Sequence, residues 1–261
     1  MERKLVKQGV NTLTVTLPAK WVQKNNLLPG DVIQLTQEEN KITITSNKEQ
    51  KEKRIEKALP NNEIKYIWHN IIGHYIQGYD YIHFTYQASE FKYEHILPGF
   101  LLEKQTRTEI ILRSIVKQPE EQDNLRRILH LFVEHAQLLE QGKSVQEIKE
   151  HESILDQQIN YALRLLNKYN KERYQQFLIL NTIELASDQL TLIGKHLQEK
   201  KRAQELSNIT KEFVTYFLKK DSKNLYTVLR SAKKENKKKD FVDGLIYTYI
   251  EILYDNIGFL M

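Results

Sequence analysis

The 261-residue sequence contains no cysteine, and this absence excludes disulfides, thiolate metal sites and a cysteine nucleophile. It also lacks any apolar run near the roughly 18 residues that a membrane-spanning helix needs. The N-terminus has no apolar core of the kind found in signal peptides. We therefore expect a cytoplasmic protein without direct membrane insertion, in which any role at a membrane would act through a partner.

Signatures of catalysis are missing as well. The sequence contains no nucleophile elbow, no Gly-rich phosphate loop and no HExxH motif, so we expect a protein that is not an enzyme. Charged residues make up 28% and hydrophobic residues 40%, which is typical of an ordered soluble protein. The formal net charge is only +5, but Lys195–Lys239 holds 14 Lys and Arg against 5 acids. A basic stretch of this kind favours phosphate or other anionic surfaces.

The N-terminal 46 residues contain the most informative pattern. Thr12–Leu17 alternates polar and apolar residues, the period of a half-buried strand. Pro18 lacks a backbone donor, so it ends strand pairing and suits the first turn of a helix. In Leu28–Asp31, Pro29 fixes φ and Gly30 accepts positive φ, which indicates a turn. The predicted order is a strand, a short helix, a turn and two strands: Thr12–Leu17, Ala19–Asn25, Leu28–Asp31, Val32–Leu35 and Lys41–Thr45.

A module this short buries too little core to be stable alone, so we infer that dimerisation completes it. Leu5–Leu35, and above all Leu17–Trp21 followed by Leu28–Asp31, resembles the SpoVT/AbrB family. The resemblance implies a swapped-hairpin β-barrel over residues 1–46, built from two chains, that binds DNA through basic residues. The matching positions are Arg3, Lys4, Lys7 and Lys20. The Trp21 form resembles the archaeal subset fused to a PhoU-like domain.

Ser46–Lys57 is dense in charge and predicts a solvated linker, with an additional DNA-binding arm as the alternative. Residues 59–118 predict a small α/β domain. It would contain a helix over Asn61–Gln77 that Gly78 ends, and strands over Tyr79–Tyr86 and Glu109–Val116. Phe91–Leu101 is ambiguous, and a helix interrupted at Pro98 is one interpretation.

Residues 121–261 predict an all-α domain. The pattern favours six helices with short connections, which pack as antiparallel neighbours in a bundle. Gly142 is a stop signal, and Ser144 and Asp240 are start signals. The expected helices are 121–141, 144–169, 173–200, 203–220, 222–237 and 240–260.

An internal repeat carries a set of acids. The third helix has an apolar stripe, Ile179–Ile193, that recurs in the last helix as Ile246–Leu260. A constant offset of 67 residues also separates Glu184 from Glu251 and Asp188 from Asp255. This recurrence favours a tandem repeat of two three-helix units.

Glu152 and Asp156 show the same i, i+4 spacing on the second helix, so several carboxylates could face one another. All-oxygen ligation suits a divalent or iron-type metal cluster. The alternative is a set of salt-bridged surface acids, with Lys195 and Arg164 as partners. His130, His135 and His151 could add ligands, although solvated helix histidines are the expected interpretation.

Residues 121–260 resemble PhoU, whose tandem three-helix repeats carry ExxxD motifs that hold metal clusters. The resemblance implies a phosphate-responsive transcriptional regulator with metal on Glu184/Asp188, Glu251/Asp255 and the preceding Asp156. One alternative is an interaction protein that inhibits a phosphate ABC transporter ATPase or a sensor kinase, with the N-terminal domain serving for dimerisation. Another is an antitoxin-like module. Lys233–Lys239 fits either a contact with nucleic acid or anionic lipid, or a solvated helix end.

Overall fold

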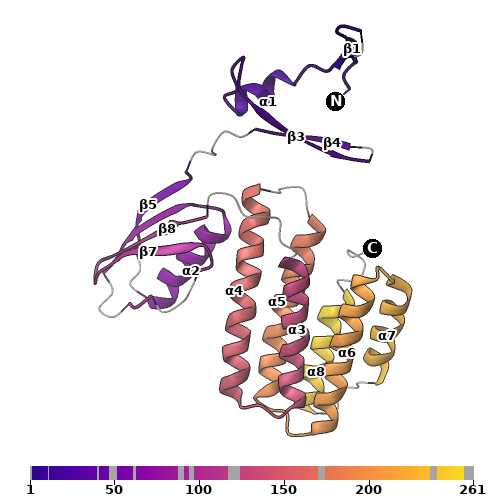
Figure 1. Ribbon diagram of the computed structural model, residues 1–261. Coiled ribbons are helices and arrows are strands. Elements are labelled where there is room, and N and C mark those ends of the chain that lie inside the picture. The colour runs from indigo at the N-terminus through magenta and orange to yellow at the C-terminus, as the bar shows by residue number, and fades with distance from the viewer. Residues whose placement is uncertain are drawn as a thin grey trace. The chain divides into compact units, whose positions relative to one another are not determined.

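The fold is seen in a computed structural model of the chain (Figure 1). The chain separates into two compact units, Met1–Glu52 and Lys53–Met261. No helix within the described residues is both long enough and apolar enough to cross a membrane. The structure describes residues 2–10, 12–39, 41–46, 52–60, 63–87, 91–93, 97–116, 124–169, 174–235 and 240–255.

The first unit is β-rich. β1 (Val6–Lys7) pairs antiparallel with β2 (Leu13–Thr14), and β3 (Ile33–Glu38) pairs antiparallel with β4 (Lys41–Ser46). α1 (Ala19–Lys24) begins directly after Pro18. The order β2, α1, β3 and β4 agrees with the prediction, although the first predicted strand is reduced to two paired residues. β1 was not predicted.

The turn before β3 is built as its sequence predicts. The Leu28 N–H donates to Asp31 Oδ2 at 2.6 Å, and the Asp31 N–H donates back to the Leu28 carbonyl at 3.0 Å. Gly30 has a φ of +96°, a conformation that side chains with a Cβ rarely adopt. The turn therefore depends on the residue types that identified it.

The described strands of this unit form two separate two-stranded sheets, and no closed barrel is found among them. Two hairpins from one chain leave their outer edges unpaired, so they cannot close a barrel by themselves. The swapped-hairpin barrel expected from the resemblance would need the strands of a second chain.

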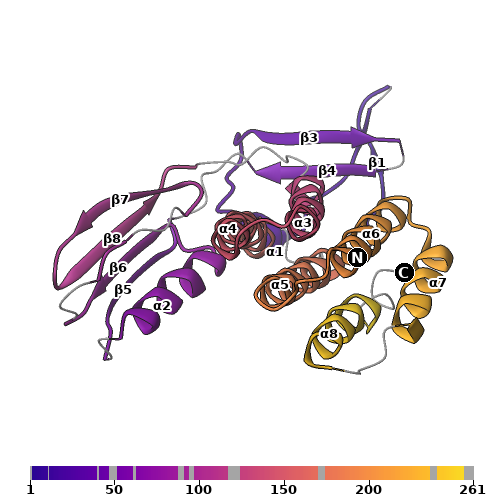
Figure 2. The same ribbon diagram turned by 90° about the horizontal axis from the view of Figure 1, so that it is seen from below.

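The second unit begins with a four-stranded sheet in the order β5-β6-β8-β7. β5 runs parallel to β6, while β8 is antiparallel to both β6 and β7. α2 covers one face of this sheet and also contacts α4 (Figure 2). The bounds of these elements are β5 (Arg54–Ala58), α2 (Ile64–Ile76), β6 (Tyr81–Thr85), β7 (Phe100–Gln105) and β8 (Glu109–Ser114).

Two of these strands were not predicted. β5 lies partly in the segment expected to be a solvated linker, and that prediction is wrong for residues 54–57. The reason is that the apolar strand β6 offers a free edge, on which Ile55 packs toward the core while Arg54 and Glu56 stay exposed. β7 begins at Phe100, inside the segment whose sequence was ambiguous.

The six predicted helices of the bundle are confirmed in order, but the third ends at Gly194 and not at residue 200, where the fourth already begins. Two of their starts have the expected caps: Ser144 and Glu147 form a reciprocal capping box, and Asp240 Oδ1 accepts the Asp243 N–H at 2.7 Å. The expected boundary at 118–121 and the stripe residues Ile257 and Leu260 lie outside the described residues. The helices are α3 (Asn124–Glu140), α4 (Val145–Tyr169), α5 (Tyr174–Gly194), α6 (Lys200–Leu218), α7 (Ser222–Glu235) and α8 (Phe241–Asp255).

Packing in the bundle follows the internal repeat. α3, α4 and α5 contact one another, and α7 packs between the neighbouring α6 and α8. The two three-helix sets meet where α3 packs against α6 and where α5 packs against α8. α3 and α6 are the first helices of the two repeats, and α5 and α8 are the third. Both copies of the apolar stripe supply buried core residues, among them Ile183 in α5 and Ile250 in α8.

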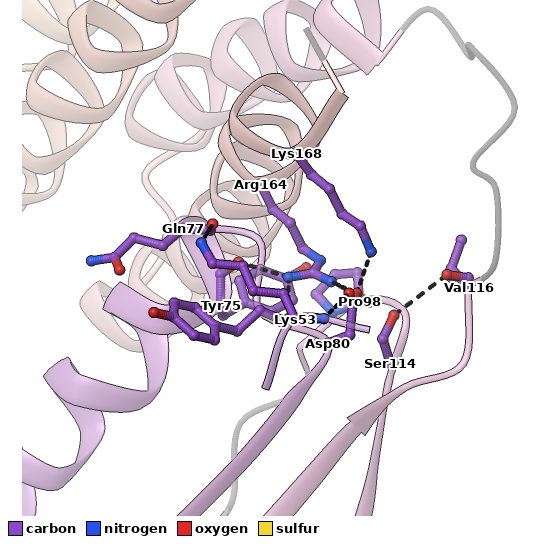
Figure 3. Close-up of polar contacts among 10 residues, drawn as sticks. Lys53, Tyr75, Gln77, Asp80, Pro98, Ser114, Val116, Arg164 and Lys168 are labelled. Carbon is purple, nitrogen blue, oxygen red and sulfur yellow. Dashed lines mark hydrogen bonds and ion pairs between the residues drawn. The ribbon is translucent and has the colours of Figure 1, made fainter. Parts of the chain in front are cut away.

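A buried polar junction joins the sheet to the bundle (Figure 3). Asp80 precedes β6, and its Oδ1 accepts a hydrogen bond from Arg164 Nη2 at 2.9 Å and also contacts the Lys168 ammonium. Arg164 donates to the Tyr79 carbonyl at 2.6 Å as well. Asp80 Oδ2 accepts the backbone N–H of Lys53 at 3.1 Å, directly before β5. One carboxylate therefore ties the start of the second unit to α4.

Gly78 makes this close approach possible. Its φ is +82°, and a Cβ at this position would lie only 3.1 Å from Cβ of Lys168. Gly78 therefore ends α2, as predicted, and also leaves room for α4.

Candidate functional site

The four residues predicted to contact DNA all have exposed side chains. Lys7 lies in β1 with Arg3 and Lys4 shortly before it, and Lys20 lies in α1. Long basic side chains in water are free to reach phosphate oxygens. The structure thus leaves these four residues available for an anionic partner.

The same unit exposes an apolar surface. Pairing of Leu35 with Ile44 and of Gln37 with Ile42 places Leu35, Ile42 and Ile44 on one face of the β3–β4 hairpin. Leu35 is 61% exposed and Ile42 is 67% exposed, whereas a strand face of this kind is normally covered in a folded domain. Leu5, Leu13 and Val32 are exposed as well. A hydrophobic surface this extensive on a small unit indicates a protein interface.

In the helical region, four of the six predicted metal ligands lie near one another. Glu152 and Asp156 come from α4, and Glu184 and Asp188 from α5. We call these four side chains the carboxylate cluster. Burial, followed by the charges of the other three, raises the pKa of Asp156 to about 7. Its Oδ1 is buried and has no hydrogen-bond partner among the described residues. Burial and the charge of Asp188 raise the pKa of Glu184.

A hydrogen bond also joins the two helices within the cluster. This hydrogen bond joins Glu152 to Asp188. It raises the pKa of Glu152 and lowers that of Asp188, so the shared proton resides on Glu152. Burial raises the pKa of both residues. Helices that carry like charges in contact destabilise the fold unless protons or cations neutralise them. The carboxylate cluster is therefore a place where a cation would relieve repulsion.

A histidine pair lies beside the cluster. His135 in α3 is fully buried and stacks on His151 of α4, with ring centroids 5.4 Å apart. The two Nδ1 atoms are 3.3 Å apart, and His135 Nε2 is 3.0 Å from Thr191 Oγ1. Thr191 also hydrogen-bonds Glu152. Burial, with the charge of His151, lowers the pKa of His135 to about 4.

The interpretation of His135 as a solvated histidine is therefore wrong, while His130 is exposed as expected. His135 follows Phe132 by three residues and directly precedes Ala136, so it lies on the apolar stripe of α3. That spacing is the signal by which the sequence could have identified it as a buried residue. Thr191, which links it to the cluster, offers no comparable signal.

The remaining two predicted ligands have a different neighbour. Glu251 Oε1 forms an ion pair with Lys233 Nζ at 3.1 Å, and Asp255 also acts on this ammonium. These carboxylates thus lie with a lysine of α7. Arg164, proposed as a partner for the acids, pairs instead with Asp80.

In the part of the chain that the structure describes, no three acidic or histidine side chains are gathered closely enough to hold a metal ion. The six residues remain a prediction as metal ligands. For the carboxylate cluster, binding would require the side chains of α4 and α5 to rotate toward a common centre.

Comparison with known families gives a match for the N-terminal unit. Residues 6–53 match the family described as "Antidote-toxin recognition MazE, bacterial antitoxin". The N-terminal unit is a MazE/AbrB-like domain. No match to a curated protein or to a solved structure is found. The match covers the β-rich unit from β1 onward, with Lys7, Lys20 and the apolar hairpin face, and ends as the second unit begins; Arg3 and Lys4 lie just before it.

Proposed function

We propose that this chain is a transcriptional regulator that binds DNA as a homodimer through its N-terminal unit. The family match over residues 6–53 carries the proposal, since MazE/AbrB-like domains typically dimerise and bind DNA. The exposed Arg3, Lys4, Lys7 and Lys20 support it, because lysine and arginine contacts to phosphate supply a large share of a protein's affinity for DNA.

The apolar hairpin face supports the homodimer. Leu35, Ile42 and Ile44 would be buried if a second copy contributed its own hairpin to a shared barrel. Each fully buried aliphatic side chain contributes about 1.5–3 kcal/mol, so such a face can provide the core that one chain lacks. A dimer of this kind presents two equivalent basic surfaces and favours a roughly palindromic DNA site.

The helical region would act as the sensor. Its resemblance to PhoU is the basis for proposing phosphate status as the signal, and a divalent cation on the carboxylate cluster as the cofactor. The paired arrangement of two three-helix sets is consistent with that resemblance. Relief of repulsion among Glu152, Asp156, Glu184 and Asp188 supports the cation. Contact with a phosphate transporter ATPase or a sensor kinase is the alternative role for this region.

A second candidate function is an antitoxin-like regulator, which the description of the matched family favours. In that case the chain would bind a toxin protein as well as DNA. Co-expression with the product of an adjacent gene would distinguish the two: relief of growth arrest would support an antitoxin, and absence of any toxic neighbour would oppose it.

The test is DNA selection from a random duplex library by the full-length protein, followed by a salt series on the selected site. Lys4→Ala with Lys7→Ala should weaken binding and reduce the slope of log K against log salt by about two to four, since each dimer loses up to four phosphate contacts. The matched control is Lys41→Ala with Lys57→Ala. It removes the same charge from exposed positions that are not among the predicted DNA contacts.

Leu35→Ser with Ile42→Ser tests the dimer in the same assay. We expect a monomer by analytical ultracentrifugation and loss of selective binding. If the wild-type protein selects no sequence, or if the Lys4/Lys7 variant binds as tightly as the wild type, the proposal is wrong.

A further inference from the structure

α7 carries one row of exposed basic side chains. Lys223, Arg230 and Lys234 are all exposed, and their spacing of seven and four residues places them on one side of the helix. We call these three residues the α7 stripe. At 1.5 Å per residue it extends over about 16 Å.

The opposite side of α7 is its packing face. Leu225 and Leu229 are buried there, in the core shared with α6 and α8. α7 is at the outer edge of the bundle (Figure 2), so the stripe, on the side opposite these leucines, points away from the neighbouring helices. Lys233 lies to the side and has its own partner in Glu251, at 3.1 Å.

Between the stripe residues there is no acidic side chain to neutralise them. The sequence from Ser222 to Lys234 contains no Asp or Glu. The other exposed positions are neutral hydrogen-bonding groups: Asn224, Tyr226, Thr227 and Ser231. A surface of cations and neutral polar groups differs from a normal solvated helix, in which charges of both signs alternate.

The corresponding helix of the first repeat shows the opposite charge. α4 carries Glu147, Glu150, Glu152 and Asp156 over its first three to four turns. The two halves share helix order and packing, so bundle stability does not require a basic α7. The charge of α7 therefore indicates an anionic partner.

We infer that the α7 stripe binds the phosphodiester backbone of duplex DNA, next to the site that the N-terminal unit occupies. This inference rests on the proposed function. Duplex DNA carries one charge per about 1.7 Å of axis, so a 16 Å row of cations meets several phosphates. Once the N-terminal unit is bound, the tethered helical region experiences a high local concentration of the same DNA, so even weak contacts add affinity.

The test compares duplexes that cover only the selected site with duplexes extended by 20 base pairs of random sequence on each side. Wild-type protein should bind the extended duplex more tightly and with a steeper salt dependence. Lys223→Gln, Arg230→Gln and Lys234→Gln together should remove that gain and lower the slope by about two to three per bound chain. Glutamine keeps a high helix propensity, so α7 should stay folded, which circular dichroism checks.

The matched control is Lys65→Gln, Arg127→Gln and Lys149→Gln, which removes three exposed charges from other parts of the second unit. This control should keep the gain from flanking DNA. Equal gain and slope in the α7 variant and the wild type would overturn the inference while leaving the proposed function intact.

The same measurements can also support the α7 inference while they oppose the proposed function of the N-terminal unit. Binding that depends on the α7 stripe but not on Lys4 and Lys7 would support a DNA-binding α7 and oppose the proposed role of the N-terminal unit. Stripe-dependent binding to vesicles containing 30% phosphatidylserine, with unchanged DNA binding, would assign the stripe to lipid and overturn the inference.

Discussion

Arg164 of α4 and Asp80, directly before β6, form an ion pair of 2.9 Å between residues 84 positions apart in the chain. Their side chains are only 5% and 11% exposed. The guanidinium also lies 4.7 Å from the Phe100 ring. Since α4 carries Glu152 and Asp156 nearer its N-terminus, a single helix extends from the carboxylate cluster to the segment that follows the N-terminal unit.

Asp80→Asn should destabilise the second unit by about 3 kcal/mol or more. The substitution leaves Arg164 and Lys168 buried without a compensating charge, and breaking one side of a buried pair typically costs about 3–5 kcal/mol. Urea unfolding followed by circular dichroism at pH 7 measures the change. Lys143→Gln, which removes one member of an exposed pair with Glu147, serves as the control and should leave the midpoint nearly unchanged. An Asp80→Asn midpoint equal to that of the control would contradict the prediction.

His135 should make the protein sensitive to acid. Its pKa falls from the usual 6.5 to about 4 in the folded state, so the unfolded chain binds the extra proton first. The free energy of unfolding should therefore drop as pH falls from about 6.5 to about 4, by on the order of 3 kcal/mol for this residue. The facing groups are His151 of α4 and Thr191 and Ser187 of α5.

His135→Gln keeps a group that can hydrogen-bond Thr191 but cannot titrate. Urea unfolding at pH 8, 6.5, 5 and 4 should show a flatter pH dependence for this variant than for the wild type. At pH 8 His135 is neutral in both states, so any difference there reports packing alone. Equal slopes for the two proteins between pH 6.5 and 4 would show that His135 does not contribute.

Neutralising the carboxylate cluster should stabilise the cation-free protein. Burial and the charges of three neighbouring acids raise the pKa of Asp156 to about 7, so its ionised form is unfavourable in the folded protein. Asp156→Asn removes that charge, and the melting temperature in EDTA should therefore rise. If the cluster binds a divalent cation, Mn²⁺ or Mg²⁺ at about 100 times its Kd should stabilise the wild type by about 2.7 kcal/mol. For a unit of this size that is about 5–10 °C, and Asp156→Asn should abolish it.

Glu251→Gln is the comparison variant for the second predicted set. Because Glu251 already pairs with Lys233, we expect this variant to retain the cation-induced shift. A wild-type melting temperature that is independent of both cations, together with a stabilised Asp156→Asn, would show that the cluster is a set of strained acids and no cation site.

Local sequence was sufficient for the helices of the bundle and for the N-terminal module. Helix boundaries follow from the 3.6-residue apolar period and from caps such as Ser144 and Asp240, which involve residues only a few positions apart. The Leu28–Asp31 turn likewise depends on four consecutive residues. The family match of the N-terminal module lies within 48 continuous positions, 6–53.

Contacts between distant residues were decided by the tertiary structure alone. β5 forms because a strand 27 residues later, at Tyr81, offers a pairing edge to Arg54, and its own charged sequence carries no strand signal. The same holds for the partner of Arg164, the burial of His135 against His151, and the pairing of Glu251 with Lys233. Periodicity shows which side of a helix is apolar, but only packing determines which helix it meets and which polar groups then lie together.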